Sequence, residues 1–131
     1  MENRSILIDT SIIIDYIRAK QKENSLLYKL FKDDYEIFIS AITTFEIYNG
    51  VNPNNLKLIE IIFNKLHSIS FNNDIAKYSS AIYNDLKSNN KIIEIRDIFI
   101  AATAIYKSLP LATTNRKHFN RIESLLIFEE K

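Results

Sequence analysis

The sequence predicts an α/β fold in which helices flank a largely parallel central sheet of four or five strands. Short apolar runs rich in β-branched residues alternate along the chain with longer segments whose apolar residues have helical spacing. Glycine and proline are scarce, with one Gly and two Pro in 131 residues, so we expect short connections. The length is that of one domain, and we expect residues 1–131 to form it.

The predicted strands are short apolar segments bounded by polar chain, and a buried parallel sheet has strands of this kind. Three of these segments are followed by polar residues: residues 5–8, 36–40 and 109–113. Residues 69–71 form a further brief extended piece, and residues 125–128 form the last strand.

The predicted helices fill the space between these strands, at residues 12–20, 22–32, 43–50, 53–67, 73–88 and 93–106, with a helical turn or loop at 115–121. Thr43 and Glu46 have the spacing of a capping box, which predicts that a helix begins there. Gly50 is the only glycine, and we expect it to end that helix in a left-handed conformation. His67 is expected at the end of the helix over residues 53–67, and Asn73 or Asp74 at the start of the next.

Composition limits the possible functions. The formal net charge is +1, so a nucleic acid would have to be held by a local basic patch. There is no cysteine, which excludes disulfides, thiolate metal sites and a cysteine nucleophile. No stretch approaches the roughly 18 apolar residues of a membrane span, and no signal peptide is evident, so we expect a cytoplasmic protein with no membrane partner.

Acidic and amide side chains follow the predicted strands or open helices beside them. Asp9 directly follows the first strand, Glu46 comes soon after the second, and Asn115 follows the third. Asp97 lies in the first turn of the alanine-rich helix that precedes the third strand. If the sheet is parallel, these side chains converge at the carboxyl ends of its strands.

Clustered carboxylates repel one another, and a bound divalent cation would offset that repulsion. Oxygen ligands favour Mg²⁺ or Mn²⁺, and such a site suits phosphodiester hydrolysis. Each acid also has a plainer interpretation, and these stay open: Asp9 as a helix cap, Glu46 as a capping-box acid and Asp97 as a charge that complements a helix dipole.

Four segments resemble the motifs of PIN domains. They are residues 8–16 (IDTSIIIDY), 40–50 (SAITTFEIYNG), 97–104 (DIFIAATA) and 111–122 (LATTNRKHFNRI). Together they span almost the whole chain in the order of that family, at the length of a VapC-type toxin. The resemblance implies a PIN-like three-layer sandwich and a metal-dependent endoribonuclease that cuts single-stranded or loop RNA. It also implies a homodimer that is held inactive by a VapB-type antitoxin.

The same resemblance places Asp9, Glu46 and Asp97 at the metal-binding acidic positions, with Asn115 as a further catalytic candidate. Thr10 or Ser11 would support the first carboxylate or a metal-bound water.

The last segment departs from the family pattern. A further acid is often found there, and this chain has Asn115 and His118 instead. Asn115 could coordinate through its carbonyl oxygen but adds no charge, so one-metal and two-metal chemistry both stay open.

Two alternatives also follow from the sequence. The first is a PIN module with a degraded site that only binds RNA or protein, which Asn115 and His118 favour. The second is a receiver-like domain that accepts a phosphoryl group at an Asp. It is the less favoured, because Thr10 and not a second acid follows Asp9, and no suitable lysine follows the last strand.

Three basic residues of the last segment could contact RNA phosphates, although a solvated face would look the same in the sequence. They are Arg116, Lys117 and Arg121.

Overall fold

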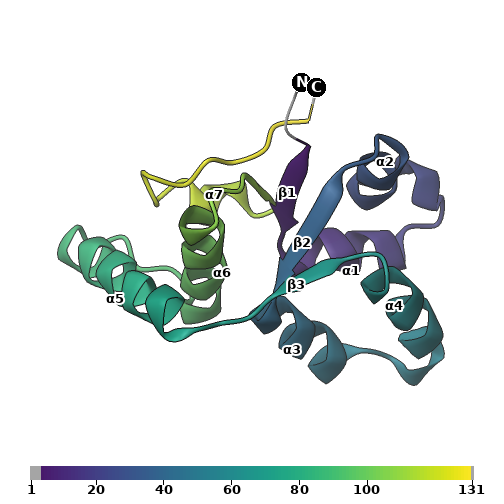
Figure 1. Ribbon diagram of the computed structural model, residues 1–131, viewed down its shortest axis with the longest axis horizontal. Coiled ribbons are helices and arrows are strands. Elements are labelled where there is room, and N and C mark those ends of the chain that lie inside the picture. The colour runs from purple at the N-terminus through teal and green to yellow at the C-terminus, as the bar shows by residue number, and fades with distance from the viewer. Residues whose placement is uncertain (1–3, 131) are drawn as a thin grey trace.

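The computed structural model describes residues 4–130, and its four strands form one parallel sheet in the order β3-β2-β1-β4 (Figure 1). The strands are β1 (Ser5–Ile8), β2 (Glu36–Ser40), β3 (His67–Ile69) and β4 (Leu111–Ala112). A single parallel bridge joins Leu111 to Ile127 beyond the edge of the sheet. The predicted parallel sheet is therefore confirmed.

Helices cover both faces of this sheet. In Figure 1, α5 and α6 lie on one side of the strands, and α1, α2 and α4 lie on the other, while α3 continues from the end of β2. The α-helices are α1 (Thr10–Arg18), α2 (Leu26–Lys32), α3 (Ala41–Gly50), α4 (Leu56–Phe63), α5 (Asn73–Ser88), α6 (Ile95–Tyr106) and α7 (Arg116–Phe119). Two 3₁₀ turns, η1 (Lys22–Asn24) and η2 (Pro53–Asn55), precede α2 and α4.

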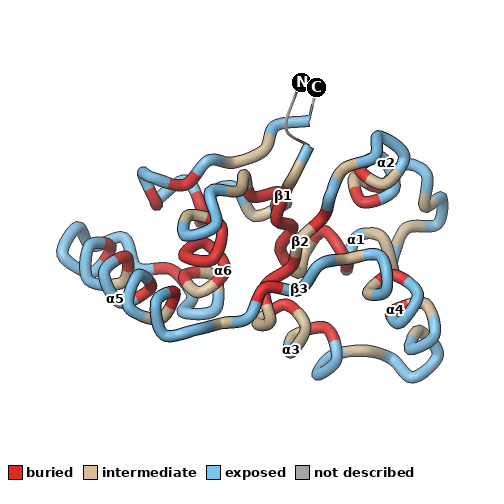
Figure 2. Tube along the Cα trace, in the orientation of Figure 1, coloured by how far each residue is buried: buried red, intermediate tan, exposed pale blue. Residues whose placement is uncertain are grey.

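The central strand β1 has a hydrophobic core on each of its faces. Successive side chains of a strand point to opposite faces, so Ile6 and Ile8 pack in the core formed with α1, α2, α3 and α4. Leu7 packs in the other core, formed mainly with α5 and α6. Figure 2 shows the buried residues along the strands and on the helix faces turned toward them. This arrangement confirms the three-layer sandwich.

Helix α6 packs closely because its inward residues are small. Ala101, Ala102 and Ala104 are completely buried. Short side chains allow a helix backbone to approach its neighbours, and α6 lies against α5 within this core. The close packing fixes the position of the first turn of α6, which carries Asp97.

Helix α3 ends at Gly50 as predicted, but its start and the conformation of Gly50 differ from the sequence prediction. Strand β2 runs directly into α3, and Ser40 caps the helix by accepting a hydrogen bond from the backbone N–H of Ile42 (3.1 Å). The capping box at Thr43 is therefore wrong, because the helix has already begun. Gly50 remains helical, and the chain leaves the helix through the extended residue Val51. The predicted left-handed conformation of Gly50 is also wrong.

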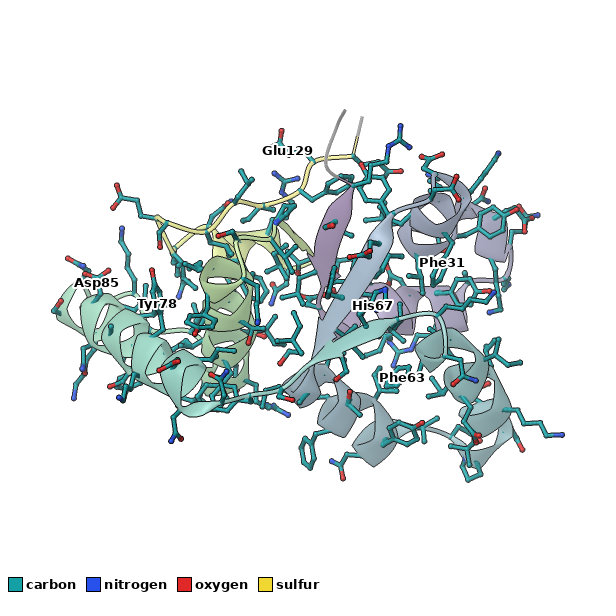
Figure 3. The ribbon with its side chains drawn as sticks, in the orientation of Figure 1. Phe31, Phe63, His67, Tyr78, Asp85 and Glu129 are labelled. Carbon is teal, nitrogen blue, oxygen red and sulfur yellow. The ribbon has the colours of Figure 1, made fainter. Side chains whose placement is uncertain are left out.

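Two further boundaries were misplaced. Helix α4 ends at Phe63, and His67 is the first residue of β3; both side chains are labelled in Figure 3. Leu66 keeps the helical spacing of the apolar residues through a turn, so periodicity alone could not mark the end. The predicted strand over residues 125–128 is reduced to the bridge at Ile127.

Candidate active site

The candidate site lies at the carboxyl edge of the sheet, beside β1 and β4. The chain builds β1, β2 and β3 outward in one direction and then returns to place β4 on the other side of β1. Ligands of open parallel sheets bind where the strand order reverses in this way. Asp9 follows β1 and Thr113 follows β4, so both lie at this switch point.

Asp9 is buried, with 4% of its surface exposed, and hydroxyl groups contact both of its carboxylate oxygens. Oδ1 accepts hydrogen bonds from the backbone N–H of Ser11 (3.0 Å) and from the Ser11 hydroxyl (2.5 Å). Oδ2 accepts one from the hydroxyl of Thr113 (2.5 Å). Burial raises the pKa of Asp9 and outweighs these hydrogen bonds, which lower it. Asp9 is thus the N-cap of α1, as the plainer interpretation held, and also a buried carboxylate at the switch point.

Glu46 reaches the same edge from α3. Its Oε1 accepts a hydrogen bond from the hydroxyl of Thr10 (2.6 Å), which also lies 3.2 Å from the hydroxyl oxygen of the buried Thr43. Its Oε2 lies 3.4 Å from Nη1 of Arg96. Because α3 is capped by Ser40, Glu46 has no capping role, and its carboxylate is turned toward α1 and α6.

Asp97 lies in the first turn of α6 and is about one-fifth exposed. Burial raises its pKa most, and the negative charges of Asp9, Glu46 and Glu94 raise it further. His118 has the opposite effect on the pKa, with Nδ1 3.9 Å from Oδ2 of Asp97. The carboxylates of Asp9, Glu46 and Asp97 are therefore near enough for their charges to affect one another.

Asn115 and His118 complete the edge on the side of β4. The backbone N–H of Asn115 donates to the hydroxyl oxygen of Thr113 (2.9 Å), and its side-chain amide donates to Nδ1 of His118 (2.9 Å). The same Nδ1 lies 3.9 Å from Oδ2 of Asp97, so Asn115, His118 and Asp97 are neighbours at this edge.

The carboxylates do not form a ready-made ligand cluster. Within residues 4–130, no three Asp, Glu or His side chains lie together closely enough to hold a metal ion as they stand.

The three basic residues that were candidates for RNA contacts have different surroundings. Nη2 of Arg116 forms an ion pair with Glu129 (2.7 Å), a residue labelled in Figure 3 on the C-terminal stretch. Arg121 donates to the backbone carbonyl of Ile92 (3.0 Å), and Lys117 is exposed.

A groove of about 220 Å³ runs beside Glu46, between α1, α3 and α4. Its walls are mainly apolar, with Arg18 and Asn52 among its polar members; the apolar side chains include Ile14, Ile17, Ile47, Val51 and Ile59. Apolar grooves with a few placed polar groups are typical binding sites.

Two residues of this edge were missed by the sequence analysis. Thr113 could have been found by the rule that selected Asp9, because it is the polar residue directly after a strand. Arg96 gave no such signal, since a basic residue in an exposed helical turn is ordinary.

The fold and the site define an α/β protein with an acidic ligand site at the carboxyl edge of a parallel sheet. Within that class, the model of the PIN domain matches residues 6–125. The chain belongs to the PIN-domain family.

Relatives of known name agree with this assignment. The chain is 35% identical over 123 residues to Ribonuclease VapC1 of Methanocaldococcus jannaschii, an alignment that covers 93% of this chain and 84% of that protein. It is 34% identical over 113 residues to Ribonuclease VapC19 of Mycobacterium tuberculosis, covering 86% and 90%.

Solved structures have the same fold. VapBC2 from Rickettsia felis, bound to a DNA fragment from its promoter, matches with a TM-score of 0.83 and 25% identity over 97% of this chain and 99% of that one. DNA-bound VapBC from Salmonella typhimurium matches with a TM-score of 0.85 and 23% identity over 95% and 96%.

Proposed function

We propose that this protein is a VapC-type endoribonuclease toxin that hydrolyses phosphodiester bonds in single-stranded or loop RNA. The observation that supports the proposal is that Asp9, Glu46 and Asp97 come from three different parts of the chain, and that the charges of Asp9 and Glu46 raise the pKa of Asp97. The names of the relatives, Ribonuclease VapC1 and VapC19, support the same reaction class.

Asp9, Glu46 and Asp97 would hold the metal ion that this reaction requires. Their donors are carboxylate oxygens, which suit Mg²⁺ or Mn²⁺. The raised pKa values of Asp9 and Asp97 fit this role, because a cation would stabilise the charged forms that burial and neighbouring acids disfavour. Such an ion supplies Lewis-acid stabilisation of the phosphate and a water of lowered pKa.

The neighbouring side chains orient these carboxylates. Ser11 and Thr113 fix both oxygens of Asp9, and the Thr10 hydroxyl fixes one oxygen of Glu46. Groups that orient metal ligands in this way typically change metal affinity or activity by about 10–100-fold when removed. Asn115 would act at the β4 side of the site, either on the substrate or through the imidazole of His118.

We also propose that a VapB-type antitoxin inhibits the protein by binding beside the acidic edge. The groove next to Glu46 offers apolar walls for a partner's apolar side chains and an acid for a basic one. The similarity to VapBC2 from Rickettsia felis and VapBC from Salmonella typhimurium supports a partner of this kind. The homodimer stays a prediction, as does the cytoplasmic location; no helix within residues 4–130 is long and apolar enough to cross a membrane.

Incubation of the purified protein with total RNA and Mn²⁺, followed by mapping of the product ends, tests the proposed reaction. Discrete cleavage sites in unpaired regions are expected. RNA that is bound but left intact at every Mn²⁺ and Mg²⁺ concentration would instead support the alternative, a PIN module with a degraded site.

A further inference from the structure

Arg96 is a cation in an unfavourable position on its own helix. It is the second residue of α6, where the helix dipole favours negative charge, and its neighbours Glu94 and Asp97 follow that preference. The guanidinium instead bridges two acids, with Nη1 3.4 Å from Oε2 of Glu46 and Nη2 3.9 Å from Oε2 of Glu94. The position of Arg96 is therefore explained by its contacts with these carboxylates and not by the helix dipole.

The contact with Arg96 completes the set of partners of Glu46. One carboxylate oxygen accepts the Thr10 hydroxyl, and the other faces the guanidinium. The carboxylate of Glu46 is thus satisfied by the protein alone, although Asp97 beside it has a raised pKa. A divalent cation that binds Oε2 of Glu46 would compete with Arg96 for that oxygen.

We propose that Arg96 is the internal counter-ion of Glu46 and becomes a phosphate-binding residue for RNA once a divalent cation binds Glu46. The inference rests on the proposed function, since it assumes that Glu46 contributes to a metal site. Arg96 then has two opposed effects, because it weakens metal binding and strengthens RNA binding.

The chemistry of the side chain fits the second role. The planar guanidinium presents several N–H donors that match the oxygens of a phosphate, and Arg96 is 52% exposed, so a strand of RNA can reach it. RNA must approach an edge that carries Asp9, Glu46, Asp97 and Glu94, and a local cation there offsets the repulsion. Arg116 and Arg121 already have partners elsewhere, with Glu129 and the carbonyl of Ile92.

Calorimetric titration of Mn²⁺ into RNA-free protein tests the first effect. Arg96→Gln should bind Mn²⁺ about two- to fivefold more tightly than the wild type, as expected for removal of a partly exposed ion pair that competes for the ligand. Arg4→Gln is the matched control, because it removes the same charge at the amino end of β1, where Arg4 contacts the carbonyl of Asp33. The control should bind Mn²⁺ as the wild type does.

The salt dependence of RNA cleavage tests the second effect. At saturating Mn²⁺, the slope of log kcat/KM against log salt concentration should be shallower by about 0.7 in Arg96→Gln, the value for one lost phosphate contact to a single strand. Arg96→Lys should restore the slope, because it keeps the charge. Arg4→Gln should leave the slope unchanged.

Unchanged or weaker Mn²⁺ binding by Arg96→Gln would overturn the counter-ion role, and an unchanged salt slope would overturn the phosphate contact. Both results leave the proposed function intact if the wild type binds Mn²⁺ and cleaves RNA. A wild type that does neither would instead contradict the proposed function itself.

Discussion

At the scale of single residues, Asp97 is a carboxyl group whose charged form is disfavoured by its surroundings. Burial and three other acids raise its pKa, so its charge destabilises the fold in the absence of a cation. Asp97→Asn should therefore reduce RNA cleavage by at least about 100-fold, through loss of a metal ligand. The melting temperature in EDTA should stay the same or rise. Cleavage of a labelled RNA and thermal denaturation measure the two effects, and cleavage at the wild-type rate would remove Asp97 from the mechanism.

The same pKa shift predicts a pH dependence of stability. The pKa of Asp97 in the folded protein lies above its ordinary value of 3.8, so the folded state takes up the proton at higher pH than the unfolded chain. The destabilising effect of the charge is present in full above the folded pKa. It fades as the pH falls toward 3.8.

Thermal denaturation in EDTA across pH 7 to 3 checks this prediction. Asp97→Asn should be more stable than the wild type at neutral pH, and the difference in melting temperature should disappear at the acid end. An Asn variant that is less stable than the wild type at neutral pH, by an amount that disappears at acid pH, would show that the folded protein stabilises the charge of Asp97.

Thr10 offers a second test at this scale, because its hydroxyl holds Glu46 at 2.6 Å. Thr10→Val keeps the shape of the side chain and removes the hydrogen bond. We expect Mn²⁺ affinity, measured by calorimetry, to fall about 10-fold or more. Thr10→Ser should retain most of it, and equal affinities for Val and Ser would show that the hydroxyl has no orienting role.

Individual site residues were predictable where a local rule applied. Asp9 follows a strand and Asp97 opens a helix, and both positions can be read from the chain. The contact between Asp9 and Thr113 could not be read, because it depends on β4 pairing with β1 and not with β3. Sequence spacing does not determine the order of strands in a sheet.

Among the elements, α3 shows what a helix end requires. Gly50 is helical at the last position of α3, and a Cβ added there would have nothing within 4 Å. Gly50→Ala should thus stabilise the protein, by up to about 1 kcal/mol, because alanine loses less backbone entropy on folding. Urea denaturation measures this, and destabilisation by the alanine would indicate the left-handed conformation that the sequence suggested.

The helix boundaries were harder to predict than the helices themselves. Ser40 and Thr43 are both good capping residues, and only the direct passage of β2 into α3 decides between them. Residues in the left-handed conformation do follow helices α2, α5 and α6, but these residues are Asp34, Asn90 and Ser108 and not Gly50. Tertiary packing thus selects among several local signals of similar strength.

For the whole molecule, metal binding and stability should be coupled. A cation that binds only the folded state stabilises it by mass action, by about 2.7 kcal/mol at 100 times the dissociation constant. Mn²⁺ should therefore raise the melting temperature, and EDTA should abolish RNA cleavage until Mn²⁺ or Mg²⁺ is restored. Cleavage that persists in EDTA would exclude the metal-dependent mechanism.

Two single substitutions distinguish stabilisation by an ion bound at the acidic edge from nonspecific effects of the ion on the melting temperature. Arg4→Gln should show the same rise in melting temperature as the wild type, since Arg4 lies at the opposite edge of the sheet. Asp97→Asn should show a smaller rise. An equal rise in both variants would place the bound ion outside the acidic edge.

The hydrogen bond from Thr113 to Asp9 joins residues 104 positions apart, so the first strand depends on one of the last segments to be synthesised. While the chain is still being translated, Asp9 can fold into its helix cap but lacks the hydroxyl that holds its second oxygen. Asp9 acquires its second hydroxyl partner only after β4 has been synthesised and has paired with β1, so the complete acidic site forms late in folding.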